Sequence, residues 1–92
     1  MAVTVYLSGH LKRYTNGETE VRLDSDFAAV GNVLDSLWRR HPALRDRILT
    51  EQGEIRQHVN VFVGSDDVKR LSGLETPVRV SEIHIFNAVS GG

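Results

Sequence analysis

The last three residues of the chain, Ser90-Gly91-Gly92, have the clearest chemical potential in the sequence. Glycine has no Cβ, so the backbone that carries the α-carboxylate of Gly92 can enter a narrow cleft and approach a nucleotide closely. That carboxylate is unreactive until an ATP-derived adenylate gives it a leaving group. The sequence has no Gly-x4-Gly-Lys-Ser/Thr loop to hold phosphates. We therefore expect a separate enzyme to use ATP to activate Gly92.

The residues and spacings that the sequence lacks exclude several kinds of chemistry. The chain has no cysteine, which removes thiol nucleophiles, disulfides and cysteine-ligated metals. No Ser, His and Asp set can be argued from spacing, so no catalytic residue is expected. The histidines lack the spacing of metal ligands, so we expect no metal site and no bound cofactor; they are His10, His41, His58 and His84.

Length, charge and hydropathy limit the class of protein. The 92 residues suffice for one domain. With 11 Lys and Arg against 12 Asp and Glu, the net charge of -1 argues against a broad nucleic-acid-binding face. No apolar run approaches the ~18 residues of a membrane span, and the N-terminal segment lacks the pattern of a secretory signal. We expect a cytoplasmic protein with no nucleic-acid or membrane partner.

Hydrophobic periodicity predicts the elements that must position the Gly-Gly end. Apolar residues alternate over residues 3–7 and 21–23 around an Asn16-Gly17 turn, which indicates two antiparallel strands joined by a long connection. The period then changes to three and four, as in an amphipathic helix with one apolar stripe. The stripe consists of Phe27, Val30, Val33, Leu34, Leu37 and Trp38.

The ends of this helix are predicted from its flanking residues. We expect an N-cap within Asp24-Ser25-Asp26 and an end at Pro42, just after the basic residues Arg39, Arg40 and His41. A short second helical turn is predicted within residues 43–50, with Leu44, Ile48 and Leu49 facing inward.

Strand signals return in the second half of the chain. They predict strands over residues 58–64 and 82–89, with a turn at Ser65-Asp66-Asp67. Four anchors, Val68, Leu71, Leu74 and Val78, lie in the connection between them. The order β-β-α-β-β predicts an α+β fold of the β-grasp, or ubiquitin-like, plan. We expect a mixed four- to five-stranded sheet with one main helix on one face, a single domain over residues 1–89 and a flexible tail over 90–92.

Strand parity predicts a second functional feature. One helix can cover only one face of the sheet. Along the strands, every second residue points to the same face, and we assign these residues to the face that the helix covers: Val3, Val5, Leu7, Val59, Val61, Val63, Ile83 and Ile85. The opposite parity places Tyr6, Phe62, His84 and Phe86 on the open face. Aromatic side chains on a solvated sheet suggest a partner-binding patch. The alternative is that the connection over residues 64–80 folds across this face and buries them.

The basic residues around the end of the helix have two readings. Arg39, Arg40, Arg45 and Arg47 form either a solvated face that compensates the helix dipole or an electrostatic contact with a partner.

The second half of the chain resembles a known family. It contains His58-Val59-Asn60-Val61-Phe62-Val63, Asp66-Asp67-Val68, Ser72-Gly73-Leu74-Glu75-Thr76, Ile83-His84-Ile85 and the terminal Ala88-Val89-Ser90-Gly91-Gly92, in that order. This pattern resembles the ubiquitin-like sulfur carriers of the MoaD/ThiS type, most closely the CysO-type carriers of cysteine biosynthesis. Two features that are common in the family differ here. Phe86-Asn87 stands where many members have prolines, and Arg79-Val80-Ser81-Glu82 stands where many have an acidic-glycine turn.

The resemblance implies a protein co-substrate rather than an enzyme. An E1-like adenylating enzyme of the MoeB/ThiF type would adenylate Gly92, and a sulfurtransferase or sulfide donor would convert it to a thiocarboxylate. Val89, Ser90 and Gly91 would be the recognised part of the tail. The implied acceptor is a pyridoxal-phosphate-dependent cysteine synthase, after which a metalloprotease would release the product. Transfer into a thiolated natural product or a cofactor is the alternative acceptor chemistry.

Two other functional classes share the same chemistry at Gly92. A ubiquitin-like modifier would join Gly92 to lysines of target proteins. The small subunit of a molybdopterin-synthase-like complex would insert its tail into the large subunit. A plain β-grasp interaction module is a further alternative, but it leaves the Gly-Gly end unexplained.

Overall fold

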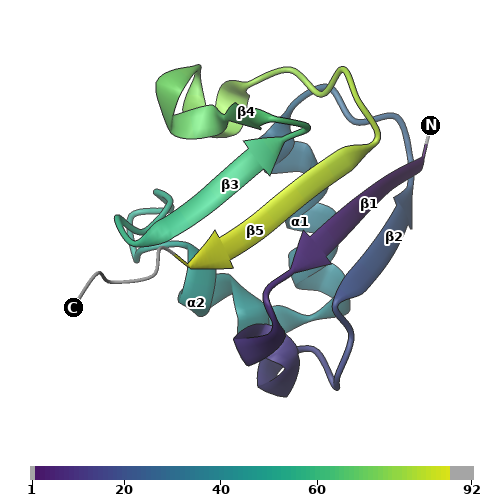
Figure 1. Ribbon diagram of the computed structural model, residues 1–92, viewed down its shortest axis with the longest axis vertical. Helices are drawn as coiled ribbons and strands as arrows, with labels where there is room; N and C mark the ends of the chain where they lie inside the picture. Colours follow the sequence, from purple (N-terminus) through teal and green to yellow (C-terminus); the bar gives the residue numbers. More distant parts are fainter. Residues whose placement is uncertain (1, 88–92) are drawn as a thin grey trace.

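Five strands form one mixed sheet in the computed structural model, which describes residues 2–87 (Figure 1). Apolar residues alternate along four of them, β1, β2, β3 and β5. The strand order is β2-β1-β5-β3-β4. The strands are β1 (Ala2–Leu7), β2 (Glu20–Asp24), β3 (Val59–Val63), β4 (Asp66–Asp67) and β5 (Glu82–Asn87). Helix α1 (Val30–Arg40) crosses behind the sheet, and the short helix α2 (Arg45–Ile48) follows it. The predicted α+β architecture, with one main helix on one face, is confirmed.

Strands from the two ends of the chain lie side by side in the middle of the sheet. β1 and β5 run parallel, with Val5 opposite Ile83, while every other strand pair is antiparallel. β5 is therefore hydrogen-bonded to β1 on one side and to β3 on the other. The pairing with β1 ends at Ile85, and Asn87, the last residue of β5, pairs with Val59 of β3. The tail residues Val89, Ser90, Gly91 and Gly92, and the predicted domain boundary at residue 89, lie outside the described residues.

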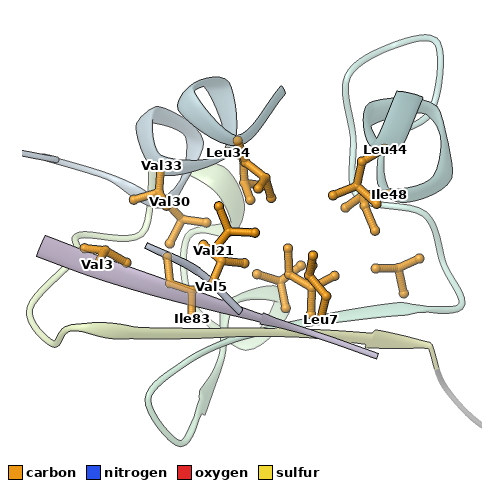
Figure 2. Packing of buried hydrophobic residues seen from close by; sticks show 14 of the residues in the cluster. Val3, Val5, Leu7, Val21, Val30, Val33, Leu34, Leu44, Ile48 and Ile83 are labelled. Carbon is orange, nitrogen blue, oxygen red and sulfur yellow. The ribbon is translucent and has the colours of Figure 1, made fainter. Parts of the chain in front are cut away.

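The buried core lies between the sheet and the helices. Every residue assigned by parity to the helix side is buried, and so are Val30, Val33, Leu34 and Leu37 of α1. Figure 2 shows these side chains meeting between the layers, with Leu44 and Ile48 closing one end. Trp38 packs against the rim of this core. The predicted apolar stripe is confirmed from Val30 to Trp38, and so are the inward residues of the second helical turn. Phe27 packs against the core but lies before the helix begins.

The connection between β1 and β2 contains a 3-10 helix, Gly9–Tyr14, which the sequence did not predict. The predicted turn follows it, since Asn16 and Gly17 have φ values of 54° and 90°. Both residues tolerate this left-handed backbone, which explains why the chain reverses there.

The predicted N-cap of the main helix was wrong. Helix α1 begins at Val30, and its N-cap is Ala29 rather than a residue within Asp24-Ser25-Asp26. Ala29 forms an isolated antiparallel bridge with Pro77, and Val30 donates its backbone N–H to Thr76. These bonds to a distant segment keep residue 29 extended, so the helix cannot begin earlier. The side chain of Asn32 caps the helix instead, accepting the Ala29 backbone N–H at 3.0 Å.

Two predictions in the second half of the chain also need correction. The turn lies at Gly64-Ser65, because Asp66 and Asp67 pair with Val63 and Phe62 as strand β4. The predicted anchor Leu71 is 56% exposed, since the 3-10 helix Val68–Arg70 ends just before it. The other anchors are confirmed: Val68 is buried, and Leu74 and Val78 pack against the core.

The β3–β4 turn depends on one glycine, and this gives a first prediction. Gly64 has a φ of 60°, and a Cβ added there would lie 3.3 Å from the side chain of Val80. We expect Gly64→Ala to lower the free energy of unfolding by about 1 to 2 kcal/mol, measured by denaturant unfolding. Gly9→Ala is the matched control, because a Cβ at Gly9 meets nothing within 4 Å. Equal stabilities of the two variants would contradict this account of the turn.

Candidate functional site

The open face of the sheet presents the four side chains that parity predicted. Figure 1 shows this face toward the viewer, with α1 behind the strands. Phe86 is 38% exposed, and Tyr6, Phe62 and His84 are partly buried. None of the four belongs to the buried core. The connection over residues 64–80 therefore does not bury this face as a second core.

Sheet register brings these four side chains into one group, here called the aromatic row (Tyr6, His84, Phe62 and Phe86). His84 on β5 lies opposite Tyr6 on β1 and opposite Phe62 on β3. The rings of Tyr6 and His84 stack with centroids 4.9 Å apart, and those of Phe62 and Phe86 lie 5.4 Å apart. The row crosses three strands and offers a continuous apolar surface with polar atoms at Tyr6 and His84, as protein interfaces often do.

Leu71 extends this surface in a way that the sequence did not predict. A hollow of about 330 Å³ lies beside Phe62 and is lined also by Arg70 and Leu71. The spacing of Leu71 from Val68 suggested an inward side chain, so no signal in the sequence pointed to its exposure. An exposed leucine beside a hollow is a suitable place for an apolar contact with another protein.

The base of the tail is Asn87, at the end of β5. Gly92 is the fifth residue beyond it, and five residues of fully extended chain span at most about 18 Å. Any active site that takes up Gly92 must therefore lie within about 18 Å of Asn87. The Asn87 side-chain oxygen is buried and has no hydrogen-bond partner among residues 2–87.

A groove of about 720 Å³ lies beside Asn87, between the 3-10 helix Gly9–Tyr14, α2 and the segment before β3. Four cationic side chains line it, and we call it the basic groove: Lys12, Arg13, Arg47 and Arg56. Sequence analysis singled out only Arg47 of these four. The others come from segments far apart in the chain, so no spacing signal could have grouped them.

The predicted basic cluster at the end of the helix does not form one surface. Arg40 pairs with Glu18 at 3.3 Å and Arg45 with Asp46 at 3.1 Å. Arg39 lines a different hollow, with Asp26 and Asp35. Of these four arginines, only Arg47 lines the basic groove.

His10 and His58 also line the basic groove. Within residues 2–87, no three His, Asp or Glu side chains gather closely enough to hold a metal ion. The same residues contain no helix long and apolar enough to span a membrane.

These features define a class of protein. The protein has a mixed sheet with β1 and β5 parallel at its centre and one helix across it. Its last strand precedes a Gly-Gly end in the sequence. This combination is that of a ubiquitin-like β-grasp protein. The chain belongs to the ThiS family, which its sequence matches over residues 5–92.

Relatives in this family include both carriers and modifiers. The chain is 38% identical to Small archaeal modifier protein 1 of Haloferax volcanii over 77 residues, which cover 83% of this chain and 85% of the relative. It is 28% identical to the sulfur carrier protein CysO of Mycobacterium tuberculosis over 95 residues, covering both chains fully. Among solved structures, it resembles a chain of the Amycolatopsis orientalis BexX/CysO complex with a TM-score of 0.84 and 32% identity, over 98% of this chain and 99% of that one.

The relatives establish the functional class at a coarse level. The chain is a member of the ubiquitin-like sulfur carriers and modifiers. Small carriers of this kind are generally not enzymes themselves. The resemblance to MoaD/ThiS-like and CysO-type carriers, drawn from residues 58–92, is confirmed.

Proposed function

We propose that the chain is a sulfur carrier whose C-terminal Gly92 becomes a thiocarboxylate. The Gly92 carboxylate oxygen attacks the α-phosphorus of ATP in an E1-like adenylating enzyme, and pyrophosphate leaves. Sulfide or a persulfide sulfur then attacks the acyl carbon, the bond to AMP breaks, and one oxygen leaves with AMP. A persulfide donor needs a thiol to cleave its S–S bond, whereas sulfide completes the exchange directly. The result is one sulfur in place of one carboxylate oxygen.

One observation carries this proposal: the match to the ThiS family runs through residue 92 and so includes the Gly-Gly end. The fold supports it, because β5 is held between two strands and ends five residues before Gly92. A fixed base with a short glycine-ended tail suits a group that is handed from one active site to another. The domain supplies recognition, and the enzymes supply the chemistry.

The proposed partners follow from the steps of this cycle. They are an E1-like adenylating enzyme of the MoeB/ThiF type that uses ATP, a sulfurtransferase or sulfide donor, and a sulfur-accepting synthase. A pyridoxal-phosphate-dependent cysteine synthase is the acceptor we favour, with a metalloprotease that restores Gly92. The chain itself binds no cofactor in this scheme, and all steps belong to the cytoplasm.

Intact-mass measurement tests the carrier chemistry directly. The full chain is incubated with an E1-like adenylating enzyme, ATP and sulfide. We expect a mass gain equal to one oxygen-for-sulfur exchange, localised to Gly92 by fragmentation. Omission of ATP is the control and should leave the mass unchanged. No gain with several enzymes of this type would overturn the proposal.

A protein modifier is the second candidate, favoured by the 38% identity to an archaeal modifier. In that case the Gly92 adenylate or thioester would be attacked by a lysine amine, giving an isopeptide bond. Adducts that carry the Gly91-Gly92 remnant on lysines in cells would favour this function. A stable heterodimer with a large catalytic subunit would instead favour the molybdopterin-synthase-like arrangement.

A further inference from the structure

We propose that the basic groove is a docking site for an acidic segment of the enzyme that activates Gly92, an inference that rests on the proposed function. Four cationic side chains from three segments face this groove: Lys12, Arg13, Arg47 and Arg56. Among the described residues that line it, Asp46 has the only carboxylate, and that carboxylate pairs with Arg45. The groove thus has an excess of positive charge in a chain whose net charge is -1.

Two of the four cations are held in place by the fold. The guanidinium of Arg47 lies over the ring of Tyr14, 5.1 Å from its centroid. The Arg56 Nε donates a hydrogen bond of 2.9 Å to the backbone oxygen of Asp46, while its terminal amino groups form no hydrogen bond with residues 2–87. Arginines fixed in this way lose little freedom when they bind a carboxylate through two parallel hydrogen bonds.

These four cations have no carboxylate partner within the described part of the chain. None of the ion pairs formed by residues 2–87 uses Lys12, Arg13, Arg47 or Arg56. By contrast, Arg40 and Arg45 each pair with a carboxylate. Four cations without a carboxylate partner therefore line one groove, and their summed field would attract a negatively charged surface.

The position of the groove identifies the kind of occupant. Asn87 lines it and is also the base of the tail. An enzyme that draws Gly92 into its active site must place its surface within about 18 Å of Asn87. That surface will cover or border the basic groove. A segment rich in Asp or Glu would meet four cations there, which would speed association and fix the orientation of docking.

Charge reversal at two exposed groove residues tests the inference. Lys12 and Arg13 are exposed, and among residues 2–87 their own side chains form no ion pair or hydrogen bond, so Lys12→Glu and Arg13→Glu should leave the fold intact. Arg79→Glu is the matched control, with the same change in charge at an exposed site beyond the other end of β5. Each full-length variant is assayed with the E1-like adenylating enzyme, ATP and sulfide.

We expect each groove variant to raise the KM for the carrier about tenfold at about 0.05 M salt, with kcat unchanged. The effect should shrink severalfold at about 0.5 M salt, because exposed charges are screened. Arg79→Glu should keep the wild-type KM at both salt concentrations.

The other outcomes separate the two proposals. If the wild type gains sulfur but all three variants share its KM, the groove inference is overturned and the carrier function stands. If the wild type gains no sulfur, the carrier function fails and this inference fails with it. A lower KM in the groove variants would mean that the chain's own Gly92 carboxylate occupies the groove. If ATP alone causes saturable shifts in the NMR resonances of the groove amides, the groove is a nucleotide-binding site. Either result would overturn docking of a protein segment.

Discussion

Deletion of Gly92 is expected to abolish thiocarboxylate formation. The shortened chain would end at Gly91, so its carboxylate would stop one residue, about 3.5 Å, short of the reacting position. A displacement of about 1 Å can already lower a rate about 100-fold, so we expect a loss of more than roughly 1,000-fold. Intact-mass analysis after incubation with the adenylating enzyme, ATP and sulfide measures it. Addition of one residue after Gly92 should have the same effect, because it removes the carboxylate from Gly92.

Both changes should leave the fold unaffected. Among residues 2–87, the buried hydrophobic core extends from Val3 to Ile85, so thermal unfolding should match that of the wild type. A chain with one extra residue before Met1 is the matched control and should gain sulfur at the normal rate. Full sulfur transfer by the chain that lacks Gly92 would refute the proposed mechanism.

Phe86→Asp is expected to weaken binding to the adenylating enzyme about 100-fold. Phe86 is the most exposed member of the aromatic row, and burying a carboxylate in place of an aromatic anchor commonly costs about 2 to 3 kcal/mol. Titration calorimetry with the adenylating enzyme measures the affinity. Phe62→Asp should act in the same direction, but Phe62 is partly buried, so its variant needs a check of folding by circular dichroism.

Val80→Asp is the matched control for Phe86→Asp. Val80 is 42% exposed, close to the 38% of Phe86, but it lies outside the aromatic row. It undergoes the same change from an apolar to an acidic side chain. We expect its affinity to remain within about threefold of the wild type. Equal affinities of Phe86→Asp and the wild type would show that the aromatic row is not the docking surface.

We expect the aromatic row and the basic groove to make separable contributions to docking. The row is apolar and crosses β1, β5 and β3, so its contribution should change little with salt. The groove is cationic and should act mainly on the association rate at low salt. Measuring both sets of variants at two salt concentrations therefore distinguishes an apolar contact from an electrostatic one.

The sequence by itself determined the layers of this protein and the two faces of its sheet. Side chains alternate with period 2 along a strand and with period 3.6 along a helix. The alternation at Val3, Val5 and Leu7 and the stripe from Val30 to Leu37 therefore predicted which residues are buried. The same alternation placed Tyr6, Phe62, His84 and Phe86 on the opposite face. The Gly-Gly end is likewise a property of the sequence alone.

Only the tertiary structure decided the features that depend on contacts between distant segments. The start of α1 is set by the bridge between Ala29 and Pro77, and Asp66-Asp67 became a strand because Gly64 reverses the chain before them. The basic groove joins Lys12, Arg47 and Arg56, which no local pattern relates. Periodicity reports which way a side chain faces within its own element. It carries no information on which other element packs beside it, and that packing is what assembles the groove at the base of the tail.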